Sequence, residues 1–169
     1  MSLQTITELP LAARFNLRVG AGNQAAAAAA LGCELPAEVG AVSSKAKLRI
    51  ICLGPDEWQL DVPESESHVI KSAFAAVSAE APHSLVDVTD REVTFRLEGP
   101  RAKDVLTIGC PRDLRDMAPG SGARTVFDTV QAVLIREAEE RFTLSVWRSF
   151  APHVRELLSI ADAELATGL

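Results

Sequence analysis

The stretch SLVDVTDREVTFRLEGPRAKDVLTIGCPRDL, from Ser84 to Leu114, carries the clearest structural pattern of the chain. Val93, Phe95 and Leu97 alternate with polar residues, which is typical of a strand with one buried face. Gly99-Pro100 then ends the strand and begins a helix, because a proline fits the first helical turn. The stretch therefore predicts a strand followed by a helix, and it contains no catalytic motif.

The residues before this strand predict a unit of the order β-α-β-β-α-β, which is the order of a ferredoxin-like fold. Asn23 favours the start of a helix and Gly32 its end, while Gly54-Pro55-Asp56 favours the turn of a hairpin. Ile70 and Phe74 belong to the apolar stripe of a second helix. The expected strands cover residues 14–19, 47–53, 57–62 and 84–88, and the expected helices follow residues 23 and 63.

A similar order recurs in the second half of the chain, although its closing strand is missing. The expected strands cover residues 92–98, 125–127, 130–136 and 141–147, and the expected helices cover residues 100–108 and 151–162. Leu3–Glu8 is one candidate for the missing strand, at an edge of the sheet. We therefore predict an α+β fold in which two intertwined ferredoxin-like β-α-β-β-α-β units form one compact domain over residues 1–169.

The composition favours a globular protein and argues against several classes of partner. Hydrophobic residues make up 47% and charged residues 24% of the 169 residues, which is usual for a folded domain. The longest apolar run, Ala25–Leu31, is shorter than the roughly 20 residues that a membrane-spanning helix needs. A net charge of −6 with scattered Lys and Arg disfavours nucleic acid. Because the N-terminal residues lack an export signal, we expect a cytoplasmic protein that does not contact a membrane.

The residue types that usually carry chemistry are present but not arranged for it. His68, His83 and His153 lack partners at metal-ligand spacing, and the three cysteines form no CxxC pair. The segment GAGNQA, from Gly20 to Ala25, is an incomplete dinucleotide fingerprint, since the third glycine is replaced by Ala25. We therefore assign no catalytic, cofactor-binding or metal-binding residue to this chain.

One segment, PRDLRDMAPGSG from Pro111 to Gly122, combines loop-forming residues with apolar side chains. Large apolar residues together with arginines are common at protein interfaces. A partner-docking loop is one interpretation of this segment, and a plain surface connection is the other. The residues that would form the interface are Arg112, Leu114, Arg115, Met117 and Arg124.

Several short stretches, read together, resemble the gamma subunit of heterotetrameric sarcosine oxidase. They are LGPDEWQL from Leu53, VDVTDREVTFRLEGPRAKDVL from Val86, GCPRDL from Gly109, ART from Ala123 and RSFAPHVRELL from Arg148. Their order and spacing carry the resemblance, because none of them is specific alone. The same region is more distantly similar to the folate-binding domain of glycine-cleavage aminomethyltransferases, which implies a shared fold.

The resemblance implies an assembly in which this chain accompanies alpha, beta and delta subunits. Such an assembly demethylates sarcosine oxidatively to glycine, passes the one-carbon unit to tetrahydrofolate and produces hydrogen peroxide. FAD, FMN, NAD and tetrahydrofolate would bind to the companion subunits, and this chain would be a non-catalytic packing subunit. We accordingly expect the isolated chain to carry no flavin.

Two other functions remain open on the sequence. The chain could be a stand-alone folate-binding module, for which Asp87, Asp90 and Asp128 are the available acidic anchors for a pterin. It could also be the equivalent subunit of an N-methylglutamate dehydrogenase complex. Because no acidic anchor stands out among the three, we expect folate to bind the isolated chain weakly or not at all.

Overall fold

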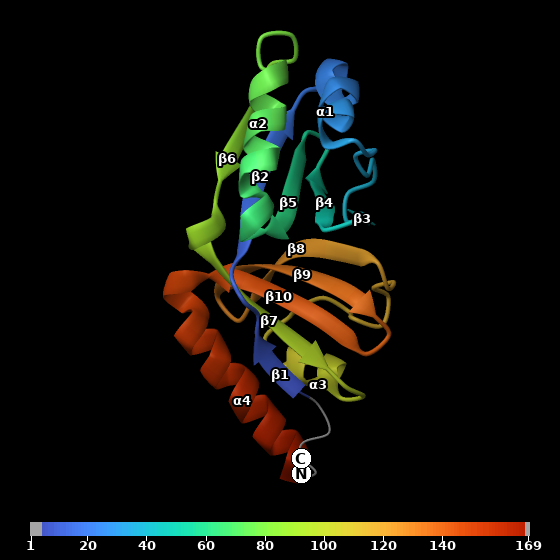
Figure 1. Ribbon diagram of the computed structural model, residues 1–169. Coiled ribbons are helices and arrows are strands. Elements are labelled where there is room, and N and C mark those ends of the chain that lie inside the picture. The colour runs from blue at the N-terminus through green and yellow to red at the C-terminus, as the bar shows by residue number, and fades with distance from the viewer. Residues whose placement is uncertain (1–4, 168–169) are drawn as a thin grey trace. The chain divides into compact units, whose positions relative to one another are not determined.

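The computed structural model describes residues 5–167, and the chain divides into two compact units (Figure 1). Leu11–Thr89 forms one of them, which we call the inserted unit. Residues 5–10 and 90–167 form the other, which we call the terminal unit. The α+β fold class is confirmed. The expectation of a single domain over residues 1–169 concerns the relation between the two units, and it stays a prediction.

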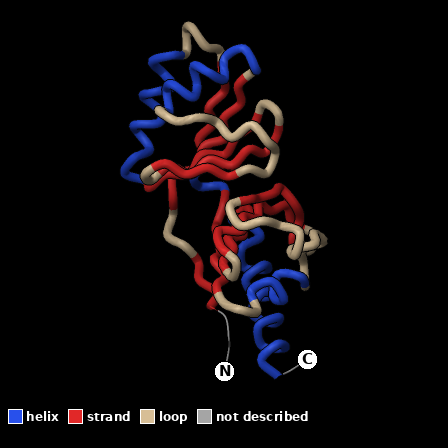
Figure 2. Tube along the Cα trace, turned by 90° about the vertical axis from the view of Figure 1, so that its right-hand side faces the viewer, coloured by secondary structure: helices blue, strands red, loops and turns tan. Residues whose placement is uncertain are grey.

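The inserted unit contains a five-stranded antiparallel sheet in the order β3-β4-β5-β2-β6. Figure 2 shows its two helices on one side of this sheet. Its strands are β2 (Ala12–Val19), β3 (Val42–Lys45), β4 (Leu48–Gly54), β5 (Glu57–Pro63) and β6 (His83–Asp87), and its helices are α1 (Gln24–Leu31) and α2 (Ser67–Val77). Without β3, this is the predicted β-α-β-β-α-β unit.

Two local predictions in this unit have different outcomes. Gly32 ends α1 in the left-handed conformation, with φ of 65°, as expected for a glycine at this position. Asn23 does precede α1, but its side chain accepts no capping hydrogen bond from the helix. Its Nδ2 donates instead to the carbonyl oxygen of Pro82, at 3.3 Å. Asn23 therefore ties the start of α1 to the residue before β6.

The terminal unit repeats this architecture with a sheet in the order β1-β7-β10-β9-β8, again antiparallel throughout. Its strands are β1 (Thr5–Glu8), β7 (Glu92–Glu98), β8 (Ser121–Phe127), β9 (Val130–Ala138) and β10 (Arg141–Trp147), and its helices are α3 (Ala102–Thr107) and α4 (Ala151–Thr167). Short 3-10 turns η1 (Ala21–Asn23), η2 (Glu64–Glu66), η3 (Thr89–Arg91) and η4 (Arg148–Phe150) adjoin α1, α2, β7 and α4.

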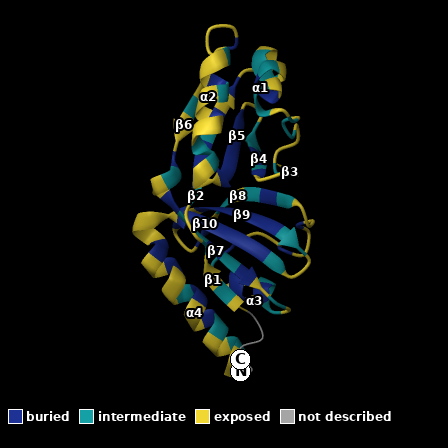
Figure 3. Cartoon of the chain, in the orientation of Figure 1, coloured by how far each residue is buried: buried dark blue, intermediate teal, exposed yellow. Residues whose placement is uncertain are grey.

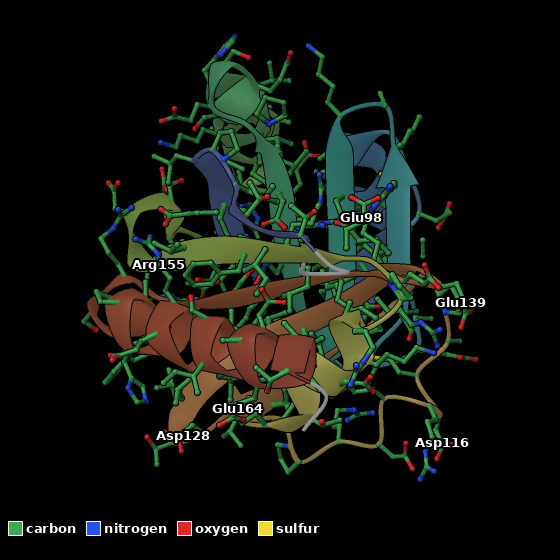
Figure 4. All side chains as sticks on the ribbon, turned by 90° about the horizontal axis from the view of Figure 1, so that it is seen from below. Glu98, Asp116, Asp128, Glu139, Arg155 and Glu164 are labelled. Atoms are coloured by element: carbon green, nitrogen blue, oxygen red, sulfur yellow. The ribbon has the colours of Figure 1, made fainter. Side chains whose placement is uncertain are left out.

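The closing strand that the second half lacked comes from the N-terminus. β1 pairs with the edge of β7, with Thr7 opposite Arg96, so the expectation of an edge strand is confirmed for Thr5–Glu8. Leu3 lies outside the described residues. Arg155 on α4, labelled in Figure 4, forms an ion pair with Glu8 on β1. The helix is thereby tied to the strand that completes the sheet.

The core of the terminal unit lies between its sheet and the helices α3 and α4. In Figure 3, β9 and β10 are dark blue along most of their length, while the outward side of α4 is yellow. Val154, Leu158 and Ala161 of α4 are buried and Leu157 is partly buried, so one apolar stripe of this helix faces the core. Burial of this stripe is the main stabilisation of a helix of this kind.

A buried ion cluster lies on the inserted unit's sheet. Asp61 on β5 accepts from Arg14 Nε at 2.7 Å and from Arg49 Nη2 at 2.7 Å, and Gln59 Nε2 also approaches its carboxylate at 3.2 Å. Burial by itself raises the pKa of Asp61, but the charges and hydrogen bonds of Arg14 and Arg49 outweigh burial and hold the pKa below its usual value. Asp61 is therefore ionised and paired at neutral pH.

Replacing Asp61 by Ala is expected to lower the free energy of unfolding by about 3–5 kcal/mol, because the buried arginine is left without its counter-ion. The pKa of Asp61 is lower in the folded than in the unfolded chain. The stabilisation of the fold by ionised Asp61 is therefore complete above the unfolded pKa of about 3.9, and it is lost as the pH falls toward the pKa of the folded chain. Chemical denaturation at pH 7 and at lower pH measures both effects. Asp56→Ala, at an exposed carboxylate, is the control, and equal losses for the two variants would contradict the prediction.

Candidate interaction surface

The predicted docking loop begins at a fixed point in the terminal unit. We call Pro111–Gly120, between α3 and β8, the connecting segment. Just before it, the carbonyl oxygen of Gly109 accepts from the backbone N–H of Asp128, at 2.7 Å. A Cβ atom at Gly109 would lie 2.9 Å from that nitrogen and 3.0 Å from the ring of Phe127, so a glycine is required at this close approach. The segment thus starts from a tight junction with the β8–β9 turn.

The two apolar residues of the connecting segment point into the protein. Leu114 is 2% and Met117 is 5% exposed, and both belong to the hydrophobic core of the terminal unit. A partner contact through these two residues stays a prediction; in the chain by itself their side chains anchor the segment to the core. The physical reason is that a long irregular segment has to bury apolar surface in order to stay ordered.

A buried arginine holds the end of the segment. Arg136 on β9 donates to the carbonyl oxygen of Met117 at 2.5 Å and to the carboxylate of Glu139 at 2.5 Å, and its own carbonyl oxygen accepts from Gly120 N at 2.8 Å. Lys103 on α3 also binds Glu139, at 3.1 Å. The hydrogen bond from Lys103 and the charge of Arg136 lower the pKa of Glu139. The segment is therefore held at both of its ends and through its buried side chains.

The exposed side chains of the segment are charged. Arg112, Asp113, Arg115 and Asp116 are all exposed, and Figure 4 labels Asp116 among them. Arg115 Nη2 binds the carboxylate of Asp113 at 2.6 Å, and this hydrogen bond lowers the pKa of Asp113 to about 2. Arg124 lies beyond the segment, on β8, and is exposed as well. Of the five expected interface residues, the arginines are thus on the surface and the two apolar residues are in the core.

The three candidate pterin anchors differ in their surroundings. Asp87 binds Lys71 at 2.7 Å, and the hydrogen bonds from Lys71 and Thr89 lower its pKa to about 2. The carboxylate of Asp128 lies 3.0 Å from His153 Nε2, and this hydrogen bond lowers its pKa. Asp90 is almost fully exposed. Each acid is therefore either bonded to a basic side chain of the same chain or open to solvent.

The remaining chemical candidates are dispersed within residues 5–167. No group of three or more His, Cys, Asp or Glu side chains in this range could hold a metal ion.

Two open cavities of about 470 and 310 Å³ occur in the inserted unit, one beside α1 and one between α2 and the β3–β4 turn, and apolar side chains form most of their lining. Trp58 is buried in the core, whereas Trp147 is 43% exposed. No helix among residues 5–167 is long and apolar enough to cross a membrane.

The fold defines a class that contains several solved proteins. Aminomethyltransferase T of the glycine cleavage system from Bartonella henselae superposes with a TM-score of 0.70 at 13% identity, covering 93% of this chain and 45% of that chain. The ligand-free regulatory subunit of aspartate kinase from Thermus thermophilus superposes with a TM-score of 0.52 at 16% identity, covering 93% and 97%. These two likenesses show a shared α+β fold.

A closer likeness identifies the family. A chain of the heterotetrameric sarcosine oxidase from Corynebacterium sp. U-96 superposes with a TM-score of 0.87 at 30% identity, covering 95% of this chain and 84% of that chain. The sarcosine oxidase gamma subunits of Arthrobacter sp. and Corynebacterium sp. strain P-1 are 31% and 29% identical over 167 residues, 96% of this chain and 81% of each relative. The model of the sarcosine oxidase gamma subunit family matches residues 18–164. This chain belongs to that family, as its sequence motifs indicated.

Met117→Ala is expected to lower the free energy of unfolding by about 2–5 kcal/mol, because it leaves a cavity in the core of the terminal unit. Arg115→Ala in the same segment is the matched control, and it should leave the free energy of unfolding nearly unchanged because Arg115 is exposed. Chemical denaturation of both variants gives the comparison. A Met117 variant as stable as the wild type would show that the segment is not part of the core.

Proposed function

We propose that this chain is the gamma subunit of a heterotetrameric sarcosine oxidase. The observation that carries the proposal is the superposition, over 95% of the chain, with a chain of such an oxidase. The assembly would work in the cytoplasm and contain alpha, beta and delta subunits as the other three members. Its reaction would be the oxidative demethylation of sarcosine to glycine, with the one-carbon unit passed to tetrahydrofolate and hydrogen peroxide produced.

In this proposal the chain contributes structure rather than chemistry. FAD, FMN, NAD and tetrahydrofolate would bind to the companion subunits. The contacts of these carboxylates fit that role: Asp61 pairs with Arg14 and Asp87 with Lys71, and Asp128 is hydrogen-bonded to His153. Such carboxylates stabilise the fold or its surface, and they are poorly suited to accept a proton near neutral pH, because each has a lowered pKa.

The exposed arginines of the connecting segment are our proposed contact with a companion. Arg112 and Arg115 are presented by a backbone that Leu114, Met117 and Arg136 hold in place. A fixed backbone lowers the entropic cost of binding, and guanidinium groups bind carboxylates through two parallel hydrogen bonds. Arg115 already binds Asp113, so the companion group that fits the segment is a carboxylate opposite Arg112.

The folate-binding alternative is supported by the fold it shares with aminomethyltransferase T. Its acidic anchor would have to be Asp87, Asp128 or the exposed Asp90. Asp87 would first have to release Lys71, and Asp128 would first have to release His153. We therefore keep weak or absent folate binding as the expectation. The N-methylglutamate dehydrogenase alternative differs in a substrate that a companion subunit would bind, so the residues of this chain do not favour it over sarcosine oxidase.

When the tagged chain is co-expressed with its companion subunits, all of them should purify together. Arg112→Glu is expected to weaken the assembly by about 2 kcal/mol, close to 30-fold in dissociation constant, because it places an anion against a carboxylate of the companion. Lys47→Glu reverses another exposed cation, on the inserted unit, and serves as the control. Sedimentation or native mass spectrometry of the purified complexes measures the difference.

Two results would count against this account in different ways. If the wild-type chain purifies without companions, the proposed function is wrong. If companions are retained equally by the wild type, Arg112→Glu and Lys47→Glu, the function stands and the connecting segment is not the contact. The thermal midpoint of each isolated variant, expected to be unchanged, separates lost binding from lost folding.

A further inference from the structure

β6 forms one edge of the inserted unit's sheet, and one side of it is open. Its five residues pair only with β2, with Asn16 opposite Val86 and Leu17 opposite Leu85. No other strand among residues 5–167 pairs with β6. An edge of this kind presents a row of backbone N–H and C=O groups to its surroundings.

The register shows which backbone groups are presented. Val88 N donates to Arg14 O at 2.8 Å, in the same register as the pairs of β2 with β6. Because bonded and non-bonded pairs alternate in an antiparallel ladder, Val86 and Ser84 also bond to β2. The N–H and C=O groups of His83, Leu85 and Asp87 consequently point to the open side. These groups are what a further strand would pair with.

The side chains of β6 favour pairing at this edge over the other three edges of the two sheets. Edge strands avoid unwanted partners by being short or by carrying a charge. β1 and β3 have four residues each, one fewer than β6, and β8 has Arg124 at its centre. The central residue of β6 is Leu85, and its neighbour Val86 is 50% exposed. Its one acidic residue, Asp87, stands at the end of the strand and is paired with Lys71.

We propose that a companion subunit of the oxidase adds an extended segment to β6 as a sixth strand of this sheet. The proposal rests on the proposed function and specifies the form of one contact. The occupant is an extended peptide, because only an extended backbone can satisfy the alternating groups of His83, Leu85 and Asp87. Its side chains should be uncharged and largely apolar, since they would lie beside Leu85 on one face and Val86 on the other.

Addition of a strand to β6 would protect the amide hydrogens of alternate residues from exchange, whereas simple burial of the surface would not follow this alternation. In the free chain, the amide hydrogens of Ser84 and Val86 should exchange slowly, because they bond to β2, and those of Leu85 and Asp87 should exchange fast. In the co-purified complex, Leu85 and Asp87 should become slow by at least about tenfold while Ser84 and Val86 stay slow. Hydrogen exchange with single-residue resolution, on the chain alone and on the complex, measures whether protection alternates along β6 or covers every residue.

A variant tests the same contact by affinity. Val86→Lys places a charge on the exposed side of the strand, and it is expected to weaken the assembly at least about tenfold while leaving the fold intact, since lysine is a common protecting residue on edge strands. Val69→Lys makes the same change at a residue of similar exposure, 47%, on α2 of the same unit, and it should leave assembly unchanged.

The outcomes are distinct. Alternating protection with selective weakening by Val86→Lys supports the proposal. A wild-type complex in which Leu85 and Asp87 still exchange fast overturns it, and so does alternating protection that arises in the isolated chain at high concentration, which would make a second copy of this chain the occupant. Absence of any complex contradicts the proposed function, a failure that the purification step reveals before exchange is measured.

Discussion

The pairing of β1 with β7 is the constraint on which the terminal unit depends. Leu11–Thr89, the whole inserted unit, separates β1 from the rest of the terminal unit along the chain. The chain therefore begins one sheet, builds a second unit, and returns to complete the first. Without β1, the edge of β7 is unpaired, Ile6 no longer packs against the core, and Arg155 on α4 loses Glu8. A contact between residues this far apart carries a high entropic cost of closure, which the finished core has to offset.

Much of this fold could be predicted because its central strands have strong period-two patterns. The alternation at Val93, Phe95 and Leu97 and the hairpin turn after β4 lie where expected. The edge strands were harder: β3 was missed because its sequence, VSSK, is short and polar, and β8 begins at Ser121, well before the predicted 125–127. Edge strands have only one neighbour, so their sequences are less constrained by burial.

In the connecting segment, the sequence pattern did not predict which side chains are buried. Leu114 and Met117 lie in a segment without periodicity, and nothing in that sequence tells whether its apolar side chains face a partner or the core. Arg136, which follows them in the chain, binds the carbonyl oxygen of Met117. Only the folded structure brings these groups together. The consequence for function is that the rigid segment displays its arginines and hides its apolar residues, while an open apolar edge lies elsewhere, on β6.

The most direct measurement of the central claim is the exchange rate of the Arg96 amide hydrogen in the full-length chain. Leu9 N donates to Thr94 O at 2.8 Å, so Thr7, in the same register, bonds to Arg96 through both backbone groups. Thr7→Pro removes a donor from this ladder, and Thr7→Ala changes only the side chain. If β1 closes the sheet as described, Arg96 exchanges slowly in the wild type and in Thr7→Ala but fast in Thr7→Pro. Equal protection of Arg96 in all three proteins would contradict the account.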